Sequence, residues 1–299
     1  MGRPCHGRGV RRPLTPTWPW WAPFWSLSGV RGATTRSKVW YTLSGGALSE
    51  VYFPRGDTAQ VRSLEFAVTD GSTFVDRESE DTVQRVRLVD PRALVYEQVN
   101  TARSGRYRIT KTYVADPRRS TALMRVRFTA LLPGTYRLFV LYDPALGNSS
   151  RGDTASRTGR DGNVALLTSE GDTHAALVAS SGFRRTSNGF VGTSDGWTDL
   201  EADRRLDFDY DTATDGHVLL TGELRVHPRV GRTTTHTLAL GFAGSDAAAE
   251  QTARASVAAG FADRAAAPTA ASGIATSPRC ARSHPFSPAG CALSTPSPS

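Results

Sequence analysis

Clustered carboxylates are the side chains in this sequence best suited to catalysis. Hydrolysis of a glycosidic bond requires a protonated acid and a second carboxylate on the other side of a pocket. The groupings that come nearest to this are Glu78/Glu80/Asp81 and Asp199/Glu201/Asp203. Both lie in loop-like or alternating stretches without an apolar frame, and acidic side chains are mostly exposed. We therefore predict solvated surface or turn residues here, and the sequence indicates no catalytic residue.

A row of aspartates has the start of a calcium-binding loop. Asp207, Asp209 and Asp211 alternate, and Asp215-Gly216 follows them. A calcium loop of this kind needs Gly at position six and Glu at position twelve, which here are Thr212 and Val218. We predict instead an outward-facing row on a strand that ends in a hairpin turn. The sequence indicates no metal site and no cofactor.

The histidines and tryptophans leave two alternatives open. His174, His217, His227 and His236 lie on separate predicted strands or turns and have no metal-binding spacing. His174 and His217 remain candidates for the pocket of a mutarotase-like epimerase. Trp197 lies between turn signals, so it is a better candidate than Trp40 for stacking on a sugar. A stand-alone carbohydrate-binding module is therefore the second alternative.

Charge and cysteine content separate the middle of the chain from its ends. The net charge is +8, yet the first carboxylate is Glu50 and the last is Asp263. Seven Lys and Arg lie in residues 1–38 and three in residues 264–299, so the middle has 36 − 10 = 26 basic against 28 acidic residues. All three cysteines also lie at the ends. We expect no nucleic-acid partner, no disulfide framework and, without a long apolar run, no membrane span.

Short strand-like runs divided by turn signals fill residues 39–242, which predicts an all-β antiparallel sandwich over residues 37–245. The stretch Ser37–Asp70 reads as an antiparallel meander that opens it. Asp207–Tyr210 reads as a strand, and Arg151–Asn163 as a polar, glycine-rich loop.

One helix is predicted at the end of this body, over residues 246–266. Ser245 is its expected N-cap, the run is rich in alanine, and Pro268 stops it. Val257 and Phe261 are spaced to give it one apolar face. We expect this helix to lead towards another structural unit.

The two ends have a different composition from the body. Residues 1–36 and 267–299 contain no carboxylate and are rich in Pro, Ala, Ser and Arg. We expect both to be irregular. One hypothesis is that they are translated out of frame, and the other is that they are disordered tails of a genuine module. Three prolines interrupt the apolar stretch Leu14–Val30, so we predict no signal peptide, and the localisation stays open.

Several stretches resemble those of a known family and follow one another in the same order as in that family. They include SKVWYTLSGGALSEVYFPRGDTAQVRSLEFAVTDG (Ser37–Gly71), YRITKTYVADPRRSTALMRVRF (Tyr107–Phe128), LYDPALGN (Leu141–Asn148), GFVGTSDGWTDL (Gly189–Leu200), DYDTATDGHVLLTGEL (Asp209–Leu224) and LALGFAGS (Leu238–Ser245). This text resembles the N-terminal β domain, domain N, of bacterial and archaeal glucoamylases and glucodextranases of glycoside hydrolase family 15.

The resemblance implies a super-sandwich of antiparallel strands, similar to galactose mutarotase. It also implies a following (α/α)₆ barrel that removes glucose from α-glucans with inversion, using two glutamates that match no position here. This chain would then be a non-catalytic module that packs against the barrel. The family's calcium cannot be placed on any residue. We take Trp197, Asp195, Asp143 and Asn148, all within matching stretches, as candidates for contact with carbohydrate or with the barrel.

Overall fold

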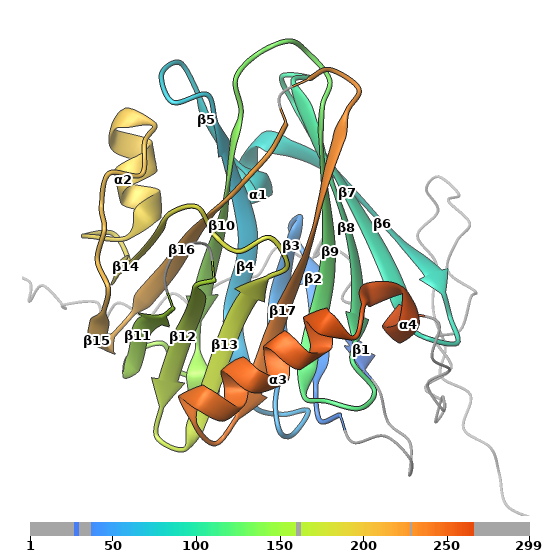
Figure 1. The fold of residues 1–299 in the computed structure, drawn as a ribbon, viewed down its shortest axis with the longest axis vertical. Helices are drawn as coiled ribbons and strands as arrows, with labels where there is room; N and C mark the ends of the chain where they lie inside the picture. Colours follow the sequence, from blue (N-terminus) through green and yellow to red (C-terminus); the bar gives the residue numbers. More distant parts are fainter. Residues whose placement is uncertain (1–26, 30–36, 160–162, 228, 266–299) are drawn as a thin grey trace, which may run out of the picture.

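The computed structural model describes residues 27–29, 37–159, 163–227 and 229–265, and these form two antiparallel sheets packed face to face (Figure 1). The predicted all-β sandwich is therefore confirmed. Most of the tails, for which irregular structure was predicted, lie outside the described residues.

The first sheet has eight strands. Its main path runs β1-β2-β3-β4-β10-β16-β14, and β5 pairs with β4 beside it. The strands are β1 (Leu27–Gly29), β2 (Trp40–Ser44), β3 (Ala47–Tyr52), β4 (Ala59–Thr69), β5 (Val75–Arg77), β10 (Arg137–Pro144), β14 (Thr186–Phe190) and β16 (Val218–Leu224). β2, β3 and β4 follow one another as the predicted meander, and β1 pairs with β2 beside them.

The second sheet has nine strands in the order β15-β11-β12-β13-β17-β9-β8-β7-β6. The strands are β6 (Thr82–Asp90), β7 (Val95–Ala102), β8 (Tyr107–Ala115), β9 (Thr121–Ala130), β11 (Asp153–Thr158), β12 (Ala165–Glu170), β13 (Thr173–Ala179), β15 (Ala213–Gly216) and β17 (Thr233–Ala243). His217 alone separates β15 in this sheet from β16 in the other.

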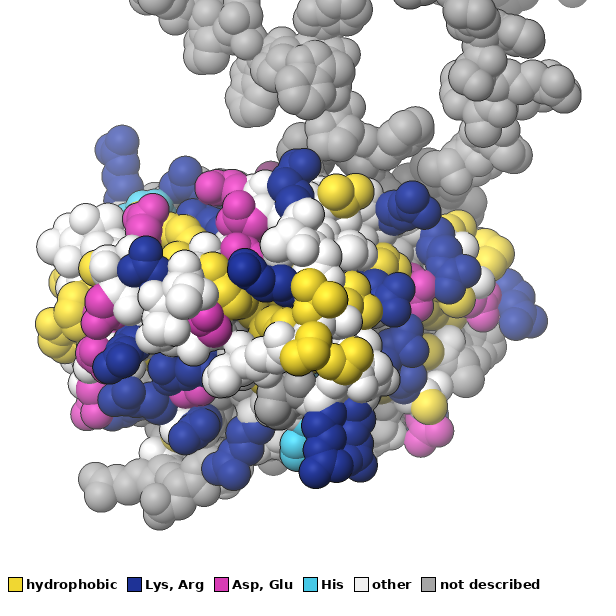
Figure 2. Space-filling model, turned by 90° about the horizontal axis from the view of Figure 1, so that it is seen from above, with side chains coloured by type: hydrophobic (Ala, Val, Ile, Leu, Met, Phe, Trp, Pro, Cys, Tyr) yellow, Lys and Arg dark blue, Asp and Glu magenta, His cyan; other side chains and the backbone are white. Residues whose placement is uncertain are grey.

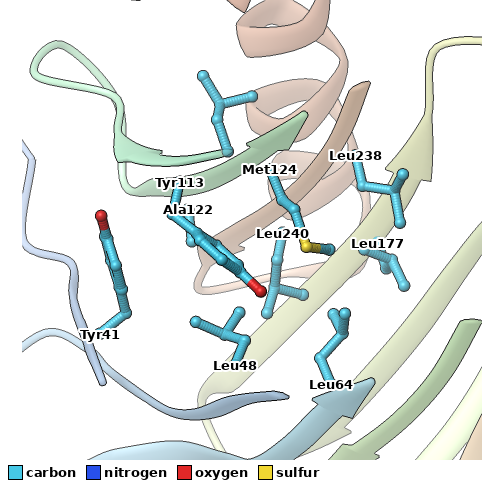
Figure 3. A pocket seen from close by; sticks show the side chains of 10 residues that line it. Tyr41, Leu48, Leu64, Tyr113, Ala122, Met124, Leu177, Leu238 and Leu240 are labelled. Carbon is cyan, nitrogen blue, oxygen red and sulfur yellow. The ribbon is translucent and has the colours of Figure 1, made fainter. Parts of the chain in front are cut away.

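The core lies between the two sheets because alternate residues of each strand point inward. Phe66, Tyr142, Tyr107 and Phe128 are among its largest side chains, and each is fully buried. A cavity of about 10 Å³ remains between Tyr41, Leu64, Tyr113 and their apolar neighbours (Figure 3). That volume holds at most one water molecule, so this part of the core has no room for a sugar.

Helices cover parts of both outer faces. The helices are α1 (Glu78–Asp81), α2 (Gly196–Asp203), α3 (Asp246–Ala258) and α4 (Phe261–Ala265), with a short 3₁₀ turn at Leu146–Asn148. The side chains of Leu200 and Leu206, in and after α2, pack on Phe139 and Leu141 of the eight-stranded sheet. Along the nine-stranded sheet, α3 buries Ala249 and Ala253 (Figure 1).

Several sequence-based boundaries were wrong. Residues 207–210 are not a strand, because the backbone N–H groups of Asp207 and Phe208 donate to the Asp199 carboxylate (2.6 and 2.7 Å) rather than to a neighbouring strand. The predicted loop Arg151–Asn163 contains β11, and the segment predicted to be irregular at the start contains β1.

The predicted helix 246–266 is two helices. The chain turns at Gly260, which has a φ of 81°, so Phe261 begins α4 instead of extending the face of Val257. The residues of α3 that are buried are Ala249, Ala253 and Ser256. Small residues are required there because Gly241 of β17 lies directly beneath them: a Cβ at Gly241 would lie 2.8 Å from the Ala253 nitrogen.

Candidate functional site

Asp195, one of the four candidate residues, holds the start of α2. Its carboxylate accepts hydrogen bonds from the backbone N–H groups of Trp197 (2.8 Å) and Thr198 (3.1 Å), and also from that of Gly192 (2.6 Å). The residue is buried. These are the contacts of a helix N-cap, so the Asp195 carboxylate is engaged by the backbone of its own loop.

Trp197 lies half-buried where α2 packs on the eight-stranded sheet. The guanidinium of Arg77 lies 5.1 Å from the centre of its ring, and the same guanidinium pairs with Glu65 at 2.7 Å. The indole is therefore occupied by a cation–π contact from an anchored arginine. This position favours a packing role over the sugar-stacking role considered from the sequence.

Asp143, at the end of the interior strand β10, is the centre of a polar cluster where the strands of the eight-stranded sheet end. Its Oδ1 lies 3.0 Å from His217 Nε2, and its Oδ2 lies 3.9 Å from Arg62 Nε. Burial raises the pKa of Asp143, while the nearby His217 and Arg62 act in the opposite direction. The pair Asp143–His217 is an acid–base arrangement, and it also ties β10 to the residue at which the chain passes from one sheet to the other.

Asn148 closes the loop beside this cluster. It has a φ of 66°, a left-handed conformation that Asn tolerates better than most residues. Its Oδ1 accepts from the backbone N–H of Ala59 (2.6 Å), and its Nδ2 donates to the carbonyl of Asp57 (3.3 Å). The side chain therefore fastens the end of β10 to the start of β4.

Asp153 is a buried acid in this region that the sequence did not reveal. Its Oδ1 accepts a hydrogen bond from the backbone N–H of Leu146 (3.3 Å), and its Oδ2 is buried without a partner among the described residues. Burial raises its pKa to about 7, and the nearby carboxylates of Glu170 and Asp143 add to the effect. A glycine-rich polar stretch predicts exposure, and only the pairing of Asp153 with Gly216 of β15 places this carboxyl inside.

The two histidines considered for an epimerase have different partners. His174 Nδ1 lies 2.7 Å from Asp246 of α3, on the outer side of the nine-stranded sheet, whereas His217 contacts Asp143. His236 is buried, and its two ring nitrogens contact Ser181 Oγ (2.7 Å) and the carbonyl of Arg225 (2.8 Å). His174 and His217 therefore bind separate carboxylates on separate elements.

Two of the carboxylates predicted to be solvated are buried, and that prediction was wrong for them. Glu78 pairs with Lys111 at 2.7 Å, and both side chains are fully buried. Asp199 is also buried, where it accepts the two backbone hydrogen bonds described above. In each case the carboxylate has internal partners, which the surrounding sequence does not encode. Glu201 and Asp203 are exposed, as predicted.

The aspartate row is partly neutralised by one arginine. Arg157 of β11 contacts the carboxylates of Asp209 (3.1 Å) and Asp211. In the part of the chain that the structure describes, no group of three His, Cys, Asp or Glu side chains is arranged to hold a metal ion. Among the same residues, no helix is both long enough and apolar enough to cross a membrane.

Large apolar side chains are exposed in three places among the described residues. One comprises Phe190 and Val191 at the end of β14 with Tyr210 after α2, and the other two lie at β6 and at a pair of loops. The edge strand β6 exposes Val83, Val86, Leu88 and Val89, each by 44% or more. The loops β9–β10 and β16–β17, joined by a hydrogen bond from Gly231 N to the Ala130 carbonyl (2.9 Å), expose Leu132 and Val230. Figure 2 looks down on the end of the sandwich where these two loops lie. It shows apolar side chains in the middle of the view with Lys and Arg around them.

Comparison with known proteins relates this architecture to glucoamylases. A glucoamylase from Clostridium sp. (strain G0005) is 34% identical over 206 residues. The crystal structure of a bacterial glucoamylase complexed with acarbose superposes with a TM-score of 0.72 and 30% identity over 81% of this chain. A GalM/aldose epimerase homologue from C. elegans aligns over 75% of this chain with a TM-score of 0.47 and 8% identity, from which we draw no argument.

The chain spans only part of these relatives: 29% of the Clostridium glucoamylase and 38% of the crystallised one. The family model described as "Glucodextranase, domain N" matches residues 15–268, beginning before the resemblance noted at Ser37 and ending close to the last helix. With two antiparallel sheets over almost all of this range, the chain belongs to the glucodextranase domain N family.

Proposed function

We propose that this domain is the non-catalytic β-sandwich of a glucoamylase-like enzyme, and that it packs against a catalytic (α/α)₆ barrel and supports it. The observation that carries the proposal is the extent of the match. The alignment covers 81% of this chain but only 38% of the bacterial glucoamylase, so most of that enzyme lies outside the shared part.

Three of the buried acidic groups support a structural role. Glu78, Asp195 and Asp199 are engaged by Lys111 or by backbone N–H groups within the fold. A general acid needs a proton that it can pass to substrate in a pocket, whereas these carboxylates face internal partners. Their contacts stabilise loops and strand ends around which another domain could be built.

The exposed apolar side chains support a neighbouring domain. Single exposed apolar residues are common, but β6, which pairs only with β7 among the described residues, exposes four aliphatic side chains. Edge strands of this kind are usually covered or blunted because they pair readily with other chains. A catalytic barrel that covers part of this surface would remove that liability.

Two assays on the purified 299-residue chain test the proposal. We expect negligible glucose release from maltooligosaccharides, and robust turnover that copurifies with the chain through two columns would contradict the non-catalytic role. Isothermal titration calorimetry with maltooligosaccharides and dextran should show no saturable heat. Saturable heat would favour the carbohydrate-binding alternative, and accelerated equilibration of α-glucose, lost on His217→Ala, would favour the epimerase alternative.

A further inference from the structure

The outer face of the nine-stranded sheet is covered at one end only. Val95, Val114, Leu123 and Ala239 lie under α3 and α4 in one apolar cluster. Further along the same strands, Ile109 of β8 and Val126 of β9 belong to the core. The residues that alternate with core residues along each of these strands therefore point outward. This second part of the face lies beyond the two helices (Figure 1).

Arginines dominate this uncovered part. The strand register aligns three rows of outward residues across β6, β7, β8, β9 and β17. These rows contain Arg85, Arg87, Arg108, Arg125 and Arg127 but a single carboxylate, Glu97, and most of the remaining positions are threonine. We call these five arginines and their rows the arginine face.

The positive charge of the arginine face is only partly neutralised within the domain. Glu97 pairs with both Arg87 (2.7 Å) and Arg127 (3.0 Å), and Arg125 lies over the ring of Phe261 in α4 (4.3 Å). Arg85 and Arg108 are exposed and pair with no carboxylate of the described residues. A solvated sheet face usually mixes both signs of charge, and the body of this protein has nearly equal numbers of each.

The position of the chain end gives this face a specific neighbour. Ala265, the last described residue of α4, packs into the apolar cluster that borders the arginine face. The arginine face ends at the edge strand β6, which also exposes Val83 and Val89. Whatever follows α4 in a longer relative therefore starts beside the arginine face.

We infer that the arginine face, with the apolar edge of β6, docks the domain that follows α4 in glucoamylase-like proteins, and that this domain presents carboxylates to it. The inference rests on the proposed function and adds the surface and the chemistry of its partner. Guanidinium groups suit such contacts because they bind carboxylates through two parallel hydrogen bonds and remain charged. Arg85 and Arg108 make the new ion pairs.

The test measures binding of the full 299-residue chain to the separately produced remainder of the Clostridium glucoamylase, outside the matched 206 residues. At 50 mM NaCl we expect the double variant Arg85→Glu/Arg108→Glu to bind about tenfold more weakly than the wild type. The matched control Arg151→Glu/Arg205→Glu has the same charge change at exposed loop positions away from the face and should bind within twofold of the wild type. Raising the salt to 300 mM should weaken the wild type and reduce the difference.

The neutral variant Arg85→Gln/Arg108→Gln keeps the test decisive if the charge-reversed protein does not fold. Its affinity for the same partner should be about threefold lower than that of the wild type. Wild-type binding that survives both face variants would overturn the docking surface and leave the proposed function in place. Equal losses in the face and control variants would also overturn the surface, because only net charge would then matter. If the wild type does not bind at all, the docking inference and the packing role both fail.

Discussion

Lys111 Nζ lies 2.7 Å from Glu78 Oε2, and neither side chain is exposed to solvent. Glu78 Oε2 also accepts the backbone N–H of Phe66 (3.1 Å), and Lys111 donates to the carbonyl of Gly46. Burial raises the pKa of Glu78 and lowers that of Lys111, while the mutual attraction of the two groups opposes both changes. The ion pair connects β8 of one sheet with α1, with β4 of the other sheet and with the turn between β2 and β3.

The first prediction concerns this pair. Lys111→Met and Glu78→Gln should each lower the free energy of unfolding by about 3–5 kcal/mol, because each leaves a buried group without its partner. The double variant should lose less than the sum of the single variants. Urea unfolding of the four proteins gives the coupling free energy directly. Additive losses would show that the two charges stabilise the fold independently of each other.

Sequence reasoning could not have found this pair. β8 alternates Tyr107, Ile109, Lys111 and Tyr113, so its period places Lys111 on the apolar face, but only the pairing of the strands identifies Glu78 as its partner. Glu78 lies in a short acidic run that is typical of a solvated turn. The two residues meet through contacts between strands that are far apart in the sequence, and a local residue pattern does not contain those contacts.

The fold could be predicted from the sequence because strands, turns and helix caps depend on residues that are close together in the chain. Alternating strands and turn residues predicted most strands to within a few residues, and Ser245 is the N-cap of α3 as predicted, accepting from Ala248 N (3.4 Å). The misses also have physical reasons. α2 depends on the cap supplied by Asp195 and on apolar contacts to the sheet, and Gly260 ends the last long helix before its expected end.

The second prediction is a pH dependence from Asp153. Its pKa is about 7 in the folded protein and about 3.9 in an unfolded chain, so between these values the folded state holds a proton that the unfolded state has lost. This contribution to stability therefore falls as the pH rises from about 4 to 7, and the cost is complete above 7.

Asp153→Asn removes that cost. The variant should match the wild type near pH 4.5 and be more stable by about 1–2 kcal/mol at pH 8, measured by urea unfolding at both values. Asp172→Asn, at an exposed turn, is the control and should show no such pH-dependent difference. A difference of equal size at both pH values would show that the Asp153 carboxyl does not titrate in this range.

The third prediction tests the close packing of α3 on Gly241 of β17. A methyl group at Gly241 would lie 2.8 Å from the Ala253 nitrogen and 2.9 Å from the Ala249 carbonyl, both of which belong to the helix backbone. Gly241→Ala should therefore displace α3 and cost about 1–3 kcal/mol in thermal unfolding. Gly244→Ala is the matched control, since its Cβ would come no closer than 3.9 Å to the Asp172 carbonyl. Equal melting temperatures for the two variants would mean that α3 can shift without cost.

The last prediction separates capping from carbohydrate contact at α2. Asp195→Ala removes the acceptor of the Trp197 and Thr198 N–H groups and should lower the free energy of unfolding by about 1–2 kcal/mol. Asp195→Asn should keep most of the wild-type stability because the amide oxygen still accepts these hydrogen bonds. Trp197→Phe keeps an aromatic ring beneath Arg77 and should cost less than Trp197→Ala, which opens a gap against the sheet. Thermal unfolding of the four variants, each repeated with excess maltotriose, gives both answers. If maltotriose raises the melting temperature of the wild type but not of Trp197→Ala, the ring contacts sugar and the packing interpretation is wrong.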